Sequence, residues 1–395
     1  MTPPLNSSSP ATALAGGGPR VAGLWPKRYD LMDGFRGLAA LMVVCFHGGF
    51  LSFGHIGVSL FFVISGYCIL ASADSCLKLK AGAREFLVRR FHRIYPPYLC
   101  ALLFFIVTRL LKIHFSHENQ LAPFTVLQYI QNATFTQWLT LFAHPNINGD
   151  NPSLMVAAFW SLNYEIQFYA VVGVLLWLVQ RTGQANLQTL IVALTAISFA
   201  WVLCVRTLCG LFIEYWPLFG CGCLVFMRLC KFKSRWSRLA VDGFLVVLVA
   251  LSIIPTFHRP DAIWIFGVLT EPIMVGSCFC LIVVLLRPLS ELVYDTLPGR
   301  MVAFLGVISY SLYLIHQFNL KLADSSVHHL LPAWTPKSIV ITAIILFHIG
   351  LATVFWFFCE RPFLNEKISL AKLFVIIRQK PAACPLIGTA DKPSS

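Results

Sequence analysis

Charged residues are scarce in this sequence. Asp, Glu, Lys and Arg make up only 12% of its 395 residues, whereas a typical soluble domain carries roughly 25%. A chain with so few ions cannot cover a water-exposed surface of the usual size, and 57% of its residues are hydrophobic. The composition therefore excludes a soluble globular protein and predicts an all-α, multi-pass integral membrane protein.

Acidic residues are the scarcer charged type. There are 17 Asp and Glu against 30 Lys and Arg, and the formal net charge is +13. In a soluble protein this excess would suggest a nucleic-acid partner. Here the basic residues fall in short segments between apolar runs, which is the placement of residues that set membrane topology. We therefore expect a lipid bilayer as partner, and no nucleic acid.

Neither a disulfide framework nor a metal site is indicated, although the chain has 13 cysteines. Most of them lie inside apolar runs, where cysteine packs as a small hydrophobic residue. The closest pairs, Cys221 with Cys223 and Cys278 with Cys280, have one intervening residue each. That spacing fits neither a zinc knuckle nor a thioredoxin-like pair.

Ten apolar segments are long enough to cross a bilayer, so about ten transmembrane helices are expected. When these segments alternate in direction, 23 of the 30 Lys and Arg fall on the side of the N-terminus. Cytoplasmic loops carry this excess, so both termini are predicted to be cytoplasmic. The segments are 31–53, 57–74, 95–111, 158–179, 187–206, 209–229, 238–257, 263–286, 302–323 and 338–359.

The domain organisation follows from these segments. The first 28 residues are rich in Pro, Ser and Gly and lack the apolar core of a signal peptide, so 1–28 is predicted to be a disordered cytoplasmic tail. A transmembrane domain is expected over 29–363 and a second cytoplasmic tail over 364–395. In a bacterium such a protein would lie in the inner membrane.

One outer connection, about 112–157, is long, and its segment from Phe124 to Leu141 is predicted to lie at the membrane interface. Its aromatic side chains are expected to rest at that interface, with stacking on sugar rings as the alternative. These side chains are Phe124, Tyr129, Phe135 and Trp138.

Ionisable residues within the first segment are expected to have a specific role, because each raises the free energy of membrane insertion by a few kcal/mol. Arg36 and His47 are eleven residues apart, or about three helical turns, so they share a face with a rise of roughly 16 Å between them. A snorkelling arginine and a hydrogen-bonded core histidine would explain each residue alone. Together they suit a donor with cytosolic phosphates and a reactive end inside the membrane, such as an acyl-CoA.

Two further arginines, Arg90 and Arg93, precede the third segment. A basic cluster in this place is ordinary for a cytoplasmic loop. However, their spacing puts both on one helix face, and paired guanidinium groups suit phosphate recognition.

Polar residues also mark the fourth and ninth segments. Glu165 is expected at a depth similar to that of His47, where it would orient the imidazole or contact an acceptor. Ser309, Tyr313 and His316 form a polar stripe by helical spacing, for which hydrogen bonding between helices is the alternative explanation.

These motifs, taken in order, resemble the acyltransferase-3 (OafA-like) family of membrane proteins over about residues 30 to 363. The resemblance is carried by Asp33-Gly34 with Arg36 and His47, the run from Gly57 through Ser65 to Tyr67, Arg90 and Arg93 before Tyr95-Pro96, Trp160-Ser161-Leu162 with Glu165, Ser309 to His316, and Glu360-Arg361-Pro362-Phe363.

The resemblance implies an integral-membrane O-acyltransferase that moves an acyl group, most commonly acetyl, from cytosolic acyl-CoA to a hydroxyl group. The acceptor would be a glycan or a hydroxylated small molecule. It implies that His47 is the essential histidine and Arg36 its partner, and that Arg90 and Arg93 form a second arginine pair. No permanently bound cofactor is expected. The sequence departs from the family where two adjacent acidic residues are common and this chain has Glu165-Ile166.

Several alternatives stay open. His47 would act either as general base on the acceptor or as a covalent acyl relay across the membrane. Asp33 is expected to hold Arg36, and a separate periplasmic or extracellular transferase is an expected partner if this chain does not act alone. A transporter that uses Arg36, His47 and Glu165 for proton coupling is the rival function. The predicted acceptor or pocket residues are Ser65, Tyr67, Trp160, Ser161, Tyr313 and His316.

Overall fold

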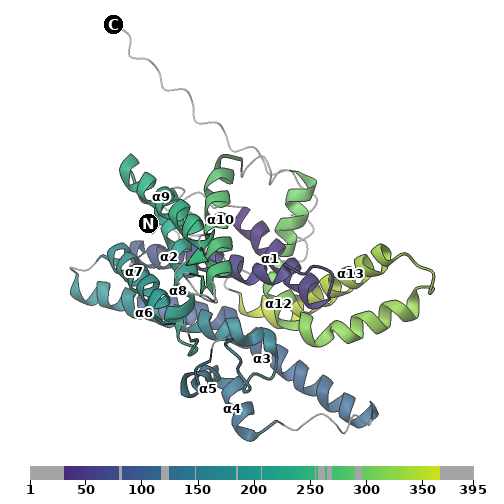
Figure 1. Cartoon of the computed structure of the whole chain (residues 1–395). Coiled ribbons are helices and arrows are strands. Elements are labelled where there is room, and N and C mark those ends of the chain that lie inside the picture. The colour runs from purple at the N-terminus through teal and green to yellow at the C-terminus, as the bar shows by residue number, and fades with distance from the viewer. Residues whose placement is uncertain are drawn as a thin grey trace, which may run out of the picture.

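The chain folds as a bundle of helices in a computed structural model (Figure 1). The structure describes residues 31–79, 82–116, 124–146, 148–183, 186–205, 207–253, 255–256, 263–264, 269–289 and 296–364. The predicted tail over 1–28 lies outside these residues, and so does the predicted tail over 364–395 apart from Leu364.

The described elements confirm an all-α protein. One antiparallel pair of two-residue strands, β1 (Pro255–Thr256) and β2 (Ile263–Trp264), interrupts the helices. The helices are α1 (Leu31–His47), η1 (Gly54–Ile56), α2 (Gly57–Lys78), α3 (Ala83–Ser116), α4 (Val126–Thr134), α5 (Trp138–Ala143), η2 (Ala157–Phe159), α6 (Trp160–Thr182), α7 (Leu187–Cys204), α8 (Phe212–Cys230), α9 (Arg235–Ile253), α10 (Thr270–Leu286), η4 (Arg287–Leu289), α12 (Leu297–Leu330), α13 (Lys337–Phe355), the π-helix η5 (Trp356–Glu360) and η6 (Arg361–Phe363).

Nine of the described helices are long and apolar enough to cross a membrane, namely α2, α3, α6 to α10, α12 and α13. The first predicted segment corresponds to α1, whose 17 residues give a length of about 26 Å, slightly below the usual 30 Å of hydrocarbon. Three prolines lie inside α3 and α8, since α3 continues through Pro96 and Pro97 and α8 continues through Pro217. Neighbouring helices and side chains satisfy the carbonyl groups that a proline frees in a membrane helix.

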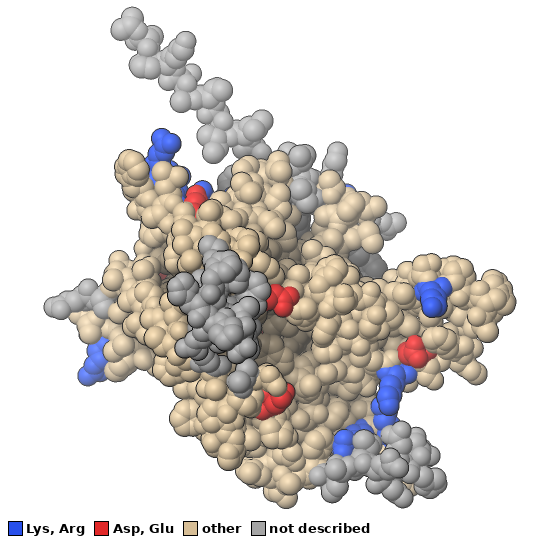
Figure 2. Space-filling view, in the orientation of Figure 1, with Lys and Arg blue, Asp and Glu red and all other residues tan. Residues whose placement is uncertain are grey.

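The molecular surface agrees with a bilayer setting. Figure 2 shows a face made almost entirely of uncharged side chains, with Lys and Arg at a few projecting points. Large apolar side chains are exposed along the helices, for example Leu103, Val174 and Leu285. Such a surface is favourable only where lipid replaces water.

Helices α2 and α8 approach so closely that only glycine fits at their contact. A Cβ atom on Gly222 would lie 2.0 Å from the carbonyl oxygen of Val63, and one on Gly66 would lie 2.0 Å from that of Phe219. Small residues allow this approach in membranes, where dispersion contacts and not the hydrophobic effect hold helices together. The same holds between α1 and α12, where a Cβ on Gly306 would lie 1.9 Å from the carbonyl oxygen of Asp33.

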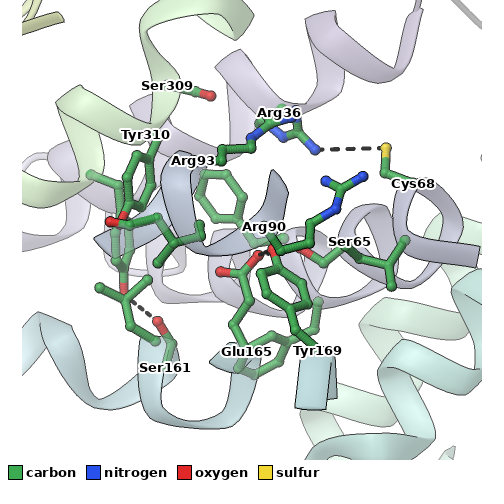
Figure 3. A pocket seen from close by; sticks show the side chains of 16 residues that line it. Arg36, Ser65, Cys68, Arg90, Arg93, Ser161, Glu165, Tyr169, Ser309 and Tyr310 are labelled. Carbon is green, nitrogen blue, oxygen red and sulfur yellow. Dashed lines mark hydrogen bonds between the residues drawn. The ribbon is translucent and has the colours of Figure 1, made fainter. Parts of the chain in front are cut away.

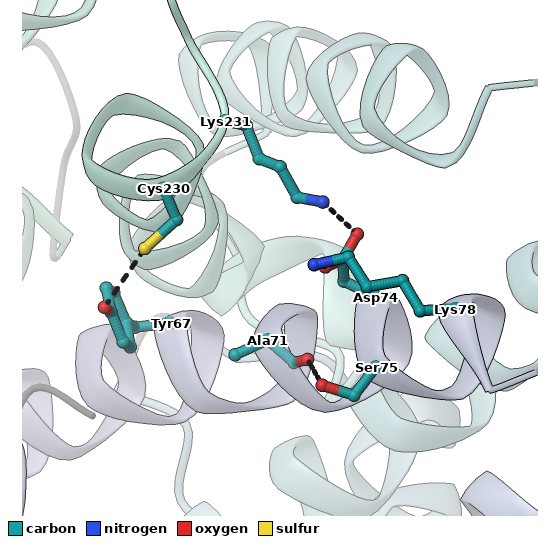
Figure 4. A network of polar contacts seen from close by, with 7 residues as sticks. All are labelled: Tyr67, Ala71, Asp74, Ser75, Lys78, Cys230 and Lys231. Atoms are coloured by element: carbon teal, nitrogen blue, oxygen red, sulfur yellow. Dashed lines mark hydrogen bonds and ion pairs between the residues drawn. The ribbon is translucent and has the colours of Figure 1, made fainter. Parts of the chain in front are cut away.

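Ion pairs join the helices at one end of the bundle, which we call the basic end; here α2, α6 and α8 end. Asp74 on α2 accepts from Lys231, which follows α8, and lies 3.1 Å from Nζ of Lys78 (Figure 4). Arg228 pairs with Asp242 on α9 through two 2.8 Å hydrogen bonds. The opposite end, where α1 ends and α2, α6 and α8 begin, is called the far end.

The long connection after α3 forms two short helices, α4 and α5, beside the bundle (Figure 1). Val126, Leu127 and Ile130 on α4 are exposed, as the predicted interfacial position requires. The prediction for Phe135 was wrong. This residue has a left-handed backbone with φ of 55°, ends α4, and buries its ring against Tyr98 with centroids 4.0 Å apart, so its ring is part of the packed core.

The topology is testable by proteolysis. We expect the basic end to face the cytoplasm, because cytoplasmic loops carry the excess of Lys and Arg. In right-side-out vesicles, a protease site inserted after Lys233 should be protected and one inserted after Trp334 should be cleaved. Cleavage after Lys233 in intact vesicles, with protection after Trp334, would reverse the orientation.

The close contact between α2 and α8 predicts that one methyl group added at the contact strongly lowers the stability of the protein. Gly222→Ala should lower the aggregation temperature of the detergent-solubilised protein, because overpacking a tight core costs about 1–3 kcal/mol. Gly243→Ala is the matched control, since a Cβ there meets nothing within 4 Å. Equal thermal stability of the two variants would contradict the close approach of α2 and α8.

Candidate active site

Five helices, α1, α2, α3, α6 and α12, enclose a cavity of about 50 Å³, which we call the arginine cavity (Figure 3). This volume holds a few water molecules but no complete nucleotide. The lining residues are Arg36, Phe61, Phe62, Ser65, Cys68, Ile69, Arg90, Arg93, Ile94, Ser161, Leu162, Glu165, Tyr169, Ser309, Tyr310 and Tyr313.

The three predicted arginines meet in this cavity. Figure 3 shows Arg36 reaching in from α1, and Arg90 and Arg93 from α3. Arg36 donates to Cys68 Sγ at 3.6 Å, and its Nη1 lies 3.9 Å from Asp33 Oδ1, as the sequence spacing suggested. The charges of Arg36 and Arg93 repel that of Arg90, whose buried Nε has no hydrogen-bond partner among the described residues. Three converging guanidinium groups form a site for an anion such as phosphate.

Glu165 lies in the arginine cavity and not beside His47. Its Oε1 accepts hydrogen bonds from Ser65 Oγ at 2.9 Å and from the hydroxyl group of Tyr169. The expected contact with His47 is therefore not formed, and His47 is not among the residues that line the cavity. Depth along the bilayer, which suggested the contact, does not fix the direction in which a side chain points around its helix.

A second carboxylate, Glu360, was not predicted as a site residue. It ends the π-helix η5, is 3% exposed, and accepts from Ser311 Oγ at 2.5 Å. The charges of Arg93 and Arg36 act on it, so it offsets part of the positive charge of the cavity. The Glu360-Arg361-Pro362-Phe363 motif was the available signal, although nothing in its spacing points to the arginines.

His47 pairs with His316. The two ring centroids are 5.0 Å apart, and His316 is fully buried while His47 is half-buried. Nδ1 of His316 lies 2.7 Å from the carbonyl oxygen of Tyr313. A carbonyl group only accepts, so Nδ1 donates and Nε2 carries the lone pair in the neutral ring. Nε2 has no hydrogen-bond partner among the described residues.

Tyr313 connects the histidine pair with the arginine cavity. Its ring lies 5.7 Å from that of His316 and also lines the cavity. Its hydroxyl donates to the carbonyl oxygen of Ala158 at 2.5 Å, so Ser161 Oγ is the donor in the 2.7 Å contact between Ser161 and Tyr313. Tyr313 and Ser161 thus form a polar layer between the arginines and the histidines.

Two predicted pocket residues lie elsewhere. Tyr67 contacts Cys230 Sγ at 3.7 Å, near the basic end of α2 (Figure 4). Trp160 lines a separate cavity on the other face of α6. Among the residues that the structure describes, no group of three or more His, Cys, Asp or Glu could hold a metal ion.

Sequence comparisons identify relatives of this chain. A family described as "Acyltransferase domain" (acyltransferase-3) matches residues 29–359. BcsY of Komagataeibacter xylinus, described as a membrane-bound transacylase, is 28% identical over 302 residues, which are 73% of this chain and 72% of BcsY. O-acetyltransferase OatA of Staphylococcus aureus is 24% identical over 316 residues, which are 74% of this chain and 50% of OatA.

A third relative, "Protein 2 in picA locus" of Rhizobium radiobacter, is 41% identical over 85 residues, or 20% of this chain and 44% of that protein. The chain thus spans about half the length of OatA. No solved structure matches.

The family match covers more than four fifths of the sequence and includes every helix that contributes to the arginine cavity. The apolar helices and the membrane-bound relatives agree with it. The chain therefore belongs to the acyltransferase-3 family of integral-membrane O-acyltransferases.

Proposed function

We propose that this protein moves an acyl group, with acetyl as the main candidate, from acyl-CoA to a hydroxyl group of a glycan or a hydroxylated small molecule. The observation that carries the proposal is that Tyr313 lines the arginine cavity and also lies with its ring 5.7 Å from that of His316, the neighbour of His47. The O-acetyltransferase name of OatA supports acetyl as the group.

The donor would approach from the basic end. The phosphates of CoA suit the guanidinium groups of Arg36, Arg90 and Arg93, which line the cavity together with one carboxylate, that of Glu165, among the described residues. A cavity of about 50 Å³ admits only a small part of the donor. The adenine end therefore stays outside, and the pantetheine arm carries the thioester toward His47. Asp33 and Glu360 would hold the arginines in place.

Chemistry would occur at His47. As general base, His47 takes the proton of the acceptor hydroxyl while the oxygen attacks the thioester carbonyl. The bond between carbon and sulfur breaks, and the departing thiolate receives the proton from the imidazolium. In the alternative, His47 itself attacks the thioester and the acyl-histidine then passes the group to the acceptor. His316 would position the ring in either case, because its ring lies 5.0 Å from that of His47 and its Nε2 has no partner among the described residues.

The family match favours an O-acyltransferase over a transporter, which was the rival function. A separate transferase partner that takes over the acyl group remains compatible with either role of His47.

Loss of His47 should abolish transfer. In membranes carrying His47→Ala, we expect labelling of envelope glycans and lipids from radiolabelled acetyl-CoA to fall by a factor of about 100 or more, the usual contribution of a general base. His328→Ala is the control, because His328 is exposed and pairs with Asp324. Labelling that is unchanged with His47→Ala would remove this residue from the mechanism.

The same membranes, incubated with labelled donor and stripped of acceptor, separate the two roles of His47. Label that stays with the wild-type protein after denaturation and is absent from His47→Ala indicates an acyl-histidine. Label on neither protein indicates a general base.

Loss of Arg36 should weaken donor binding. A hydrogen bond to a charged group contributes about 1.5–3 kcal/mol, so Arg36→Ala should raise the Kd for CoA by roughly 10- to 100-fold in isothermal titration of the solubilised protein. Arg181→Ala is the control, since Arg181 lies at the basic end over the ring of Trp177 and away from the cavity. Equal Kd values for the two variants would contradict a phosphate site at Arg36.

A further inference from the structure

A second cavity opens at the far end of the bundle, where α6 and α8 begin; we call it the far cavity. Its volume is about 470 Å³, within the range of small-molecule binding sites. The lining residues are Trp138, Leu141, Asn148, Gly149, Asp150, Asn151, Leu154, Ala157, Trp160, Asn163, Tyr164, Leu208, Gly210 and Tyr215.

The far cavity combines aromatic rings with amide groups. Trp160, Tyr164 and Tyr215 form one wall, with ring centroids 4.6 Å apart for the two tyrosines and 5.2 Å apart for Trp160 and Tyr215. Trp138 on α5 adds a fourth ring. Three asparagines and one aspartate also line the cavity, namely Asn148, Asn151, Asn163 and Asp150.

Asn163 carries a buried amide oxygen that has no hydrogen-bond partner among the described residues. Its side chain is 4% exposed, and its Oδ1 receives no hydrogen bond from any described residue. A buried acceptor in this state costs about 1–3 kcal/mol. A hydroxyl group in the far cavity would supply the missing donor after a rotation of the Asn163 amide, because Oδ1 is buried in the present side-chain conformation.

The aromatic wall is held in place before any ligand binds. The Tyr164 hydroxyl donates to Glu214 Oε2 at 2.8 Å. Glu214 also accepts from the backbone N–H groups of Cys209 at 2.5 Å and Gly210 at 3.2 Å. Asn151 is fixed as well, because its Nδ2 donates to the carbonyl oxygen of Gln137 at 2.9 Å. Such preorganisation reduces the entropy that a ligand loses on binding.

The first turns of α6 divide the far cavity from the arginine cavity. Trp160, Asn163 and Tyr164 line the far cavity, whereas Ser161, Leu162 and Glu165 line the arginine cavity. The two cavities also differ in charge. Three arginines line the arginine cavity. No Lys or Arg is among the described residues that line the far cavity, and Asp150 is the one charged residue among them.

We propose that the far cavity binds a neutral sugar ring of the acyl acceptor. The aromatic faces suit the C–H face of a pyranose, and the amide groups suit its hydroxyl groups. Phosphate groups are disfavoured because no Lys or Arg is among the described residues that line the cavity, and an acyl chain is disfavoured by four polar residues there. The proposal rests on the proposed function, since it names the substrate class of the acceptor.

The test is binding of the solubilised full-length protein to an array of neutral oligosaccharides. Wild type should bind at least one glycan, and Trp138→Ala and Asn163→Ala should each weaken that binding by roughly tenfold or more. Trp334→Ala is the matched control, because Trp334 is 82% exposed at the far end and lines neither cavity. Unchanged affinity for CoA shows that each variant is folded.

Three results would overturn the proposal: no glycan bound by wild type, binding unaffected by Trp138→Ala and Asn163→Ala, or an equal loss with Trp334→Ala. The proposed function fails separately. If glycan binding follows the expected pattern but no label passes from acetyl-CoA to the bound glycan, the sugar site stands and acyl transfer to this acceptor does not. Arg36→Ala should leave glycan binding unchanged.

Discussion

The structure depends on burying three like charges between helices that lipid surrounds. An arginine at membrane depth costs a few kcal/mol even on lenient scales, so Arg36, Arg90 and Arg93 require compensation. Asp33, Glu165 and Glu360 supply part of it from three other positions of the chain. The glycine contact of α1 with α12 brings two of the helices that line the arginine cavity close together.

Helix α6 separates two cavities that differ in charge. One face of its first two turns contributes to a cationic cavity that is too small for a nucleotide, and the other to an aromatic, amide-rich cavity about nine times larger. A charged donor and a neutral acceptor would then bind on different faces of a single helix. Neither ligand would have to displace the other, because only the pantetheine arm of the donor, with its acyl group, would extend toward the acceptor.

Hydropathy predicted the helices, and helical spacing predicted that Arg90 and Arg93 share one helix face, because both signals act locally. Contacts across helices were beyond that reasoning. Glu165 was placed beside His47 from depth alone, and the structure turns it toward Ser65 and Tyr169 instead. The pairing of His47 with His316 depends on how α1 packs against α12, which no local pattern encodes. Phe135 resembled an interfacial residue until its ring was found against Tyr98.

The separation along α1 constrains the mechanism. Arg36 and His47 are on one rigid helix, roughly 16 Å apart along its axis, so no small adjustment of side chains brings a phosphate on Arg36 to His47. A flexible donor must bridge that distance, and the pantetheine arm is the flexible part of CoA. His47 is half-buried at the far end of α1, and in the proposed function the acceptor reaches it from that end. In the proposed function, only the pantetheine arm and its acyl group therefore pass the layer of Tyr313 and Ser161, while the nucleotide and the acceptor each stay on their own side.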